Sequence, residues 1–417
     1  MHDVNSKYGY ISIASSITQI SPNDIAADIQ TELFHHSLEH LTEDDILADI
    51  PIVFLVLTGG TEQKILGLWQ KRREKFGNEP IFLLAHPGNN SLPAALEVLA
   101  RIHQENVKGK IIYLDTNSNK DCWKDLDQLL KHYQVYYQFK RTRVGLIGSP
   151  SDWLVASQLD FNQLSVIWGA AIEQIELEEL KTKIANVTDE EIEDVHYTFL
   201  KNASEIKEPK KKELKQVVKV YAALKKLVEE KNLQAVSVRC FDLVTDLNTT
   251  GCFALAKLND DGITAGCEGD IVSTIGMIWA NYLTNQTVWM ANPAKVDEQN
   301  NSILLAHCTV PIGMTEKYKL RTHFESGLGV GIQGEFSKGK ATVFRLGGKN
   351  MNKIWISNAE ILQSTDEENL CRTQLLVKLH GSAKASDLLT EPLGNHLLLM
   401  RGTYSKEMLQ WWEMFIN

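Results

Sequence analysis

The feature that most constrains the fold is an alternation, in the first third of the chain, of short apolar runs with helix-length stretches. Apolar runs at 52–57, 81–85 and 111–114 each end in a polar turn, and segments with helical spacing such as 92–103 follow. Strands separated by helices in this way build a parallel sheet wrapped by helices. We therefore predict an N-terminal doubly wound α/β domain whose first strand covers 8–13.

A second unit of the same class is predicted to begin at residue 143. Residues 143–148 are an apolar run that ends in glycine, and a long charged stretch with helical spacing follows at 173–231. We predict further strands of this unit at 236–239 and 253–258. The loop after the first run matches neither glycine pattern of nucleotide-binding loops, which disfavours a nicotinamide-dependent dehydrogenase. Ligands of such sheets bind at the carboxyl ends of the strands.

From about residue 302 the chain changes to short β-type runs with few helices between them. The runs lie at 304–309, 330–334, 341–346, 353–356 and 375–379. Short β-type runs with few helices between them are typical of antiparallel sheets. The predicted fold is α/β, with two doubly wound parallel-sheet domains, 1–141 and 142–300, followed by a β-rich C-terminal domain, 301–417.

Composition narrows the class of protein. A length of 417 residues exceeds one ordinary core, and a net charge of −10 argues against nucleic-acid and anionic membrane partners. No apolar stretch approaches the roughly 18 residues of a membrane span, and residues 1–7 lack the features of a signal peptide. None of the six cysteines forms a C-x-x-C pair, so we expect buried free thiols rather than structural zinc. We predict a cytoplasmic protein.

Two carboxylates lie two residues apart beside glycines, just ahead of an apolar helix predicted at 271–283. Asp270 directly precedes that helix, where a carboxylate caps the helix and is favoured by its dipole. Capping leaves Glu268 unexplained, because Glu268 lies ahead of the cap and follows Cys267.

Two further polar segments stand out in the C-terminal half. Asn292 ends an apolar strand directly before Pro293, which alone is ordinary turn chemistry. His396 follows Asn395 and opens the apolar run 397–400. Taken alone, a histidine at the start of a strand is typical of a core or turn residue.

Together the three segments resemble the L-fucose isomerase family over roughly residues 236–402. In that family a Glu-x-Asp opens a helix, the next strand carries a second acidic residue 24 positions after the glutamate, and a late Asn-His segment supplies a histidine. Here Asn292 stands 24 positions after Glu268, and Asn395 precedes His396.

The resemblance implies a fucose isomerase-like fold and a metal-dependent aldose–ketose isomerase. Its substrate would be a pentose, 6-deoxyhexose or modified hexose, converted through an enediol. Mn²⁺ or another divalent cation would be held by Glu268, Asn292 and His396, since carboxylate, amide and imidazole groups suit such ions. A cation on the two reacting oxygens stabilises the developing charge while a carboxylate moves the proton. The family also implies a homo-oligomer, a trimer or hexamer.

The chain departs from this pattern at Asn292, where the isomerases carry an aspartate. An amide oxygen can bind a hard cation, but it has no charge and accepts no proton at neutral pH. Three readings remain open. Asp270 shares the acid/base role with Glu268, or the chain runs a related reaction, or it is a non-catalytic or regulatory sugar-binding protein descended from an isomerase.

Other polar residues in the C-terminal half are candidates for contacts with the sugar. His307 and Arg345 end apolar runs, His323 precedes a glycine-rich segment, Arg372 follows a cysteine, and Asn395 adjoins the candidate ligand histidine. Short relatives of the isomerases carry similar His and Cys-Arg segments. The alternative for each residue is an internal hydrogen bond or ion pair.

Overall fold

The computed structural model describes residues 8–19 and 21–417 and separates two units, Met1–Gln138 with Gln410–Asn417, and Phe139–Leu409. Residues 1–7, on which the prediction about a signal peptide depends, lie outside the described residues. Within the described residues, no helix is both long enough and apolar enough to span a bilayer.

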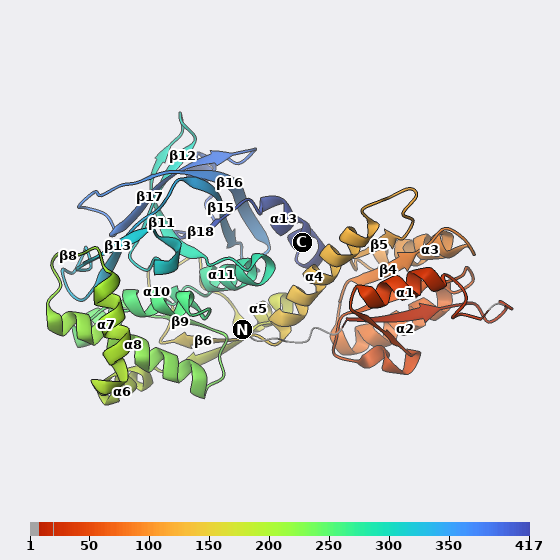
Figure 1. Cartoon of the computed structure of the whole chain (residues 1–417), viewed down its shortest axis with the longest axis horizontal. Coiled ribbons are helices and arrows are strands. Elements are labelled where there is room, and N and C mark those ends of the chain that lie inside the picture. The colour runs from red at the N-terminus through yellow and green to blue at the C-terminus, as the bar shows by residue number, and fades with distance from the viewer. Residues whose placement is uncertain (1–7, 20) are drawn as a thin grey trace. The chain divides into compact units, whose positions relative to one another are not determined.

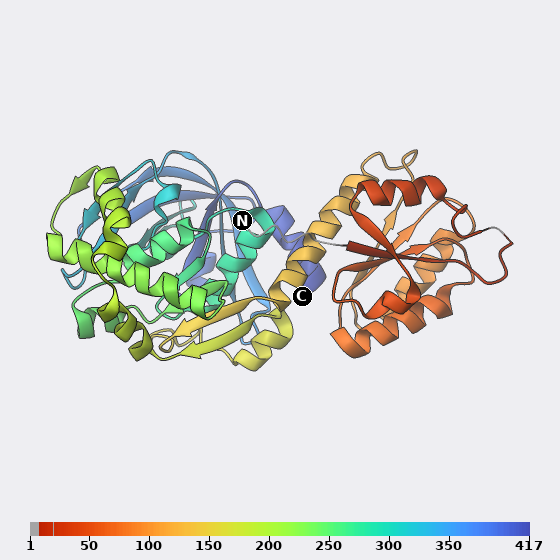
Figure 2. The ribbon, with the colours of Figure 1, turned by 60° about the horizontal axis from the view of Figure 1, so that its bottom comes forward.

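The first unit is a parallel sheet with helices on both faces (Figures 1 and 2). Its strand order is β2-β1-β3-β4-β5, and all the pairs are parallel. The strands are β1 (Tyr8–Ile13), β2 (Leu38–Leu41), β3 (Ile52–Val56), β4 (Ile81–Ala85) and β5 (Gly109–Tyr113). The helices are α1 (Ala27–His35), α2 (Glu62–Phe76), α3 (Ser91–His103) and α4 (Cys122–Lys140). The predicted parallel sheet is confirmed.

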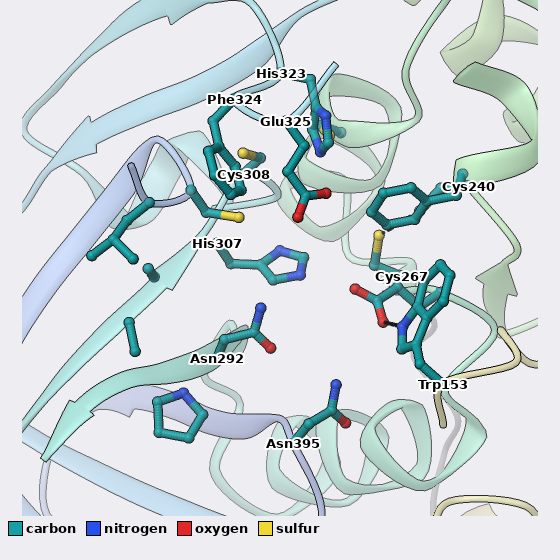
Figure 3. A pocket seen from close by; sticks show the side chains of 18 residues that line it. Trp153, Cys240, Cys267, Asn292, His307, Cys308, His323, Phe324, Glu325 and Asn395 are labelled. Carbon is teal, nitrogen blue, oxygen red and sulfur yellow. Dashed lines mark hydrogen bonds between the residues drawn. The ribbon is translucent and has the colours of Figure 1, made fainter. Parts of the chain in front are cut away.

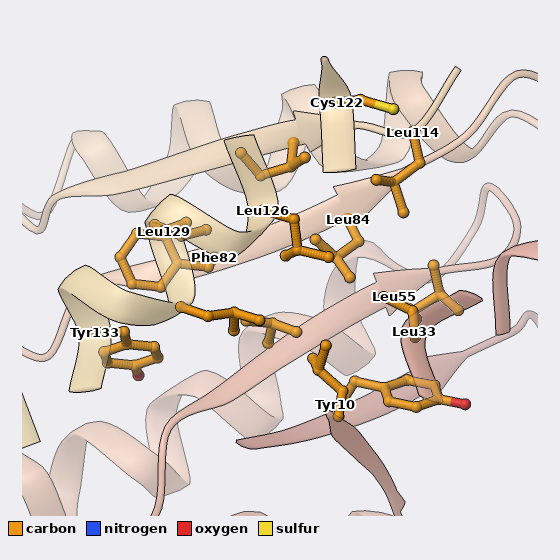
Figure 4. Packing of buried hydrophobic residues seen from close by; sticks show 14 of the residues in the cluster. Tyr10, Leu33, Leu55, Phe82, Leu84, Leu114, Cys122, Leu126, Leu129 and Tyr133 are labelled. Carbon is orange, nitrogen blue, oxygen red and sulfur yellow. The ribbon is translucent and has the colours of Figure 1, made fainter. Parts of the chain in front are cut away.

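Alternation along the strands divides the core of this unit into two layers. In β3, Val53 and Leu55 pack with α1 and α4, whereas Phe54 and Val56 pack with α2 and α3. Successive side chains of a strand point to opposite faces, so a strand covered on both sides must be apolar throughout. Figure 4 shows the first layer, in which Phe82 lies edge-on to Tyr133. Each fully buried side chain of this size contributes about 1.5–3 kcal/mol.

The second unit opens with a smaller parallel sheet in the order β10-β9-β6-β7. These strands are β6 (Arg143–Ile147), β7 (Ala171–Ile175), β9 (Ala235–Val238) and β10 (Thr264–Cys267). The helices of this part are α5 (Phe161–Trp168), α6 (Leu177–Asn186), α7 (Glu193–Asn202), α8 (Lys211–Glu230), α9 (Phe241–Leu247), α10 (Cys252–Asp260) and α11 (Ile271–Thr284).

The strand predicted at 253–258 is wrong, because this segment lies inside helix α10. The run contains two alanines and two leucines, which are good helix formers, and no β-branched residue. Its apolar residues are buried all round, which removed the periodic signal that distinguishes a helix from a buried strand.

A closed antiparallel barrel completes the unit, in the order β11-β12-β17-β16-β15-β18. Its strands are β11 (Trp289–Asp297), β12 (Ser302–His307), β15 (Gly339–Gly347), β16 (Lys353–Ser364), β17 (Thr373–His380) and β18 (Leu397–Arg401). A small sheet of β8 (Glu205–Ile206), β13 (Lys317–Arg321) and β14 (Gly331–Glu335) accompanies it. The last helices are α12 (Asp387–Thr390) and α13 (Ser405–Phe415). The predicted β-rich region is confirmed, and the barrel starts at Trp289, ahead of the predicted boundary at 301.

Helix α11 lies between the parallel sheet and the barrel (Figure 1). It packs on β9 and β10 on one side and on β11, β15 and β18 on the other. A glycine allows the close approach, since a Cβ on Gly276 would lie 2.5 Å from Leu398 Cδ1. The helix thereby brings the end of β10 and the start of β18 to the same place.

Candidate active site

A cavity of about 650 Å³ opens in the second unit, beyond the carboxyl ends of β9 and β10 (Figure 3). Barrel residues close its other side: Asn292 from β11, His307 from the end of β12, and Asn395 just before β18. Glu268 faces them from the turn after β10. The cavity is therefore placed where an α/β sheet offers its ligand site.

Glu268 sits on a strained turn. Its φ is 63°, in the left-handed region that non-glycine residues rarely adopt, and Gly269 follows with φ 68°. Any Cβ on Gly269 would meet Ser149 O at 2.6 Å. The loop after β6 also fixes the glutamate directly: Ser151 N donates to Glu268 O at 2.9 Å, and Trp153 Nε1 donates to Glu268 Oε2 at 2.5 Å. The loop thus holds the main chain of Glu268 through Ser151 and orients the buried carboxylate through Trp153.

His396 is fully buried against two carboxylates. Its Nδ1 lies 2.8 Å from Asp270 Oδ2, and its Nε2 lies 3.5 Å from Glu268 Oε1. Among the described residues Nε2 has no hydrogen-bond partner. Burial lowers the pKa of His396, but the two carboxylates outweigh it and raise the pKa to about 9. For Glu268 the signs are reversed. Burial raises the pKa of this carboxyl, and the nearby His396 more than offsets the effect, so the net shift of the pKa is downward.

Asp270 contacts His396 and does not line the cavity. Its carboxylate accepts from Ser273 N at 2.9 Å and Ser273 Oγ at 2.6 Å, and lies 3.3 Å from Arg345 Nη1. It is completely buried and does not line the cavity. Burial raises its pKa, but Arg345 and His396 bring the pKa well below the usual range. Both oxygens are engaged by the helix cap, by Arg345 and by His396, so the geometry does not favour the predicted acid/base role for Asp270.

His307 joins this group from the barrel. Glu268, His307 and His396 each offer one ligand atom, and the three atoms lie within 4.8 Å of one another. His307 Nδ1 lies 2.8 Å from Thr309 Oγ1, and burial lowers the pKa of His307 to about 4, so the ring is neutral at physiological pH. We predicted His307 as a contact to the sugar, and its position makes it a potential metal ligand as well.

Asn292 lines the same cavity as Glu268 and His307. Its Oδ1 is buried and has no hydrogen-bond partner among the described residues. Figure 3 shows the amide pointing into the same space as His307. Buried polar atoms without hydrogen-bond partners are costly, so Asn292 Oδ1, and His396 Nε2 beside Glu268, are both available to a bound ion. One carboxylate, two imidazoles and one amide oxygen fit a divalent cation.

The other predicted contacts divide into two groups. His323 and Asn395 line the cavity, whereas Arg372 and Arg345 do not. Arg372 Nε donates to Thr322 O at 2.8 Å, and its Nη1 lies 3.4 Å from Glu368. These internal contacts of the guanidinium do not favour the predicted role of Arg372 in binding substrate.

Sequence reasoning missed several lining residues. Trp153, Phe241 and Phe324 bring aromatic rings to the cavity, and Glu325 brings a second carboxylate that points inward in Figure 3. Trp153 could have been found, because it lies in the loop after β6, at the carboxyl edge of the predicted sheet. The other three lie outside strands, where no periodic pattern marks them.

The chain is similar in sequence to known sugar isomerases. The model of the L-arabinose isomerase central domain matches residues 160–283, a segment that contains Glu268 and Asp270. The sulfoquinovose isomerase of Clostridium sp. (strain MSTE9) is 27% identical over 234 residues, 53% of this chain and 51% of the relative. That of Alkalicoccus urumqiensis is 21% identical over 304 residues, 70% of this chain and 67% of the relative. That of Priestia aryabhattai is 30% identical over 87 residues, 20% of each.

In the Clostridium comparison the chain spans about half the length of the relative. The likeness supports the predicted resemblance at the level of arabinose- and fucose-type sugar isomerases and does not single out L-fucose isomerase. The chain is thus similar to intramolecular oxidoreductases that act on sugars, and the segment matched by the central-domain model carries Glu268.

Proposed function

We propose that this protein is a metal-dependent aldose–ketose isomerase. The observation that carries the proposal is the convergence of Glu268, Asn292 and His307 on one cavity, with His396 Nε2 3.5 Å from Glu268 Oε1. Neither Asn292 Oδ1 nor His396 Nε2 has a hydrogen-bond partner among the residues that the structure describes. The similarity to sulfoquinovose isomerases points to the same reaction type.

Each residue has a distinct task in this proposal. A divalent cation, Mn²⁺ or a similar ion, would polarise the two sugar oxygens at C1 and C2 when bound by these four side chains. Asp270 engages Nδ1 of His396 at 2.8 Å and so orients the ring, which leaves Nε2 as the nitrogen that would bind the cation once it has lost its proton. Trp153 orients the Glu268 carboxylate through the hydrogen bond from Nε1.

Two carboxylates line the cavity and can move the proton between C1 and C2. Glu268 is the better oriented of the two, being held by Trp153, and Glu325 approaches from the loop after β13. The amide of Asn292 cannot accept a proton, so we propose that Glu325 takes the second acid/base position. Replacing Glu325 with Gln should lower kcat about 100-fold or more while Mn²⁺ binding is retained.

We propose an uncharged aldose, a pentose or 6-deoxyhexose, as the substrate. The residues that line the cavity include neither lysine nor arginine, and they do include Glu325. A sulfonate group would therefore meet a carboxylate instead of a fixed cation. The aromatic rings and thiols suit a sugar with an apolar end.

The test is to incubate the protein with Mn²⁺ and a panel of pentoses, 6-deoxyhexoses and sulfoquinovose, and to measure ketose formation. We expect product from an uncharged sugar and none from Glu268→Gln. Turnover of sulfoquinovose alone would contradict the substrate assignment. No product from any sugar, together with no Mn²⁺-dependent thermal shift, would contradict the reaction.

A second candidate is a non-catalytic or regulatory sugar-binding protein, favoured by the amide at Asn292. It predicts sugar binding by calorimetry without turnover, whereas the isomerase predicts both. A homo-oligomer, trimer or hexamer, and a cytoplasmic location stay predictions, and light scattering of the purified protein would measure the former.

A further inference from the structure

Cysteines are concentrated around the cavity. Five of the six line it: Cys240, Cys252, Cys267, Cys308 and Cys371. The sixth, Cys122, lies in the core of the first unit. The proposed isomerase reaction uses none of these thiols, so the cluster calls for a separate explanation.

Two of the thiols form a close pair. The Sγ atoms of Cys240 and Cys267 lie 2.8 Å apart. A disulfide has an S–S length of about 2.05 Å, so closing the bond needs a movement of less than about 1 Å. The pair joins two neighbouring parallel strands, since Cys267 ends β10 beside Val238 of β9 and Cys240 follows β9 by two residues.

The pair is also reachable by a small oxidant. Both side chains are buried from bulk solvent, at 5% and 4% exposure, yet both line the 650 Å³ cavity. A molecule much smaller than a sugar can enter through the same opening. No cation, carboxylate or aromatic ring separates the two sulfur atoms at this distance.

We propose that Cys240 and Cys267 form an oxidative modification site, at which a peroxide converts the two thiols into a disulfide. One thiolate attacks an oxygen of hydrogen peroxide, which forms an S–O bond, breaks the O–O bond and gives a sulfenic acid with release of hydroxide. The second thiol then displaces the sulfenic oxygen as water and forms the S–S bond. Two thiols are oxidised, and one peroxide is reduced to two waters.

The modification acts on the proposed active site through the chain itself. Cys267 directly precedes Glu268, whose φ of 63° leaves the turn little freedom to absorb a movement. Drawing Cys267 towards Cys240 therefore shifts the glutamate relative to Trp153 and His396. This consequence depends on the proposed function, and we expect a loss of turnover of at least about tenfold, reversed by dithiothreitol.

The test is peroxide treatment of the full chain, alkylation of the remaining thiols and peptide mapping without reduction. We expect one cross-linked peptide pair, Cys240 with Cys267, lighter by two hydrogen atoms and cleaved by dithiothreitol. Cys240→Ala and Cys267→Ala should each abolish it, while Cys122→Ala, the matched control outside the cavity, should keep it. Thermal unfolding of each variant establishes that it is folded.

Two results would overturn the site: cross-links through Cys252, Cys308 or Cys371 instead, or complete alkylation of both thiols after peroxide treatment of folded protein. The mapping needs no catalytic activity. A cross-link in a protein that turns over no sugar would leave the site standing and count against the proposed function. Turnover of a sugar without a cross-link would support the proposed function and count against the oxidation site.

Discussion

At the scale of single residues, the proposed binding of a cation depends on Asn292, an uncharged amide at the position where the isomerase family carries an aspartate. Asn292 presents a buried oxygen that has no hydrogen-bond partner within the described part of the chain, and we propose that this oxygen binds the cation although the side chain carries no charge. Its neighbours supply one buried negative charge, Glu268, together with two histidines. The site therefore has less charge for a cation than a two-carboxylate site would have.

Replacing Asn292 with Asp should strengthen Mn²⁺ binding by about tenfold, because it adds a negative charge next to the cation. Calorimetric titration with Mn²⁺ measures the change. Asn395→Asp is the matched control, since Asn395 is the other amide lining the cavity, and it should change the affinity less. Weaker binding by Asn292→Asp would show that the amide does not face the ion.

Replacing Asp270 with Asn should act through His396. It removes the buried charge opposite Arg345 and the acceptor that orients Nδ1. We expect a loss of about 3–5 kcal/mol in the free energy of unfolding, because Arg345 is left buried without its charge partner. We also expect a loss of about 10–100-fold in Mn²⁺ affinity.

Urea unfolding and Mn²⁺ titration of this variant measure the two effects. Asp260→Asn is the control, because Asp260 accepts backbone hydrogen bonds from Ile312 and Gly313 away from His396. Equal Mn²⁺ affinity in wild type and Asp270→Asn would rule out the positioning role.

At the scale of elements, α11 determines how closely the barrel approaches the parallel sheet. Its N-terminus carries Asp270, and its face towards β18 contains Gly276 next to Leu398. A glycine inside a helix ordinarily costs about 0.5–1 kcal/mol relative to alanine. Here the missing side chain allows the contact that brings His396 to Glu268.

Gly276→Ala should therefore destabilise the protein by about 1–3 kcal/mol, since its Cβ would lie 2.5 Å from Leu398 Cδ1 in a packed core. Gly67→Ala in helix α2 is the matched control, because nothing lies within 4 Å of the new Cβ. The control should gain about 0.5–1 kcal/mol from helix propensity. Chemical denaturation of both variants decides the matter, and a stabilised Gly276→Ala would contradict the close approach.

At the scale of the whole molecule, sequence patterns predicted the sheets better than they predicted contacts between them. The alternation of apolar runs and helices identified the parallel sheets, and the short β-type runs identified the barrel region. The run 253–258 was missed because a helix buried all round has no polar face. The spacing of apolar residues shows which side of an element is buried, and the segment 253–258 is buried on all sides.

In the candidate site, too, some residues could be predicted from the sequence, whereas their contacts with distant residues could not. The spacing of Glu268, Asn292 and His396 identified residues that the structure brings to one place. The contacts of Asp270 and Arg372 could not be predicted from the chain, because they are made with Arg345 and with Thr322 O, 75 and 50 residues away in the sequence. The role of His307 depends on closure of the barrel, which places the end of β12 beside the start of β18.

Anomalous diffraction from crystals grown with Mn²⁺ would locate the cation. We predict one strong peak inside the cavity, within bonding distance of Glu268, Asn292, His307 and His396, with Asp270 touching His396 but not the ion. A peak at any other place, or Asn292 turned away from an ion held by the remaining three residues, would contradict this prediction.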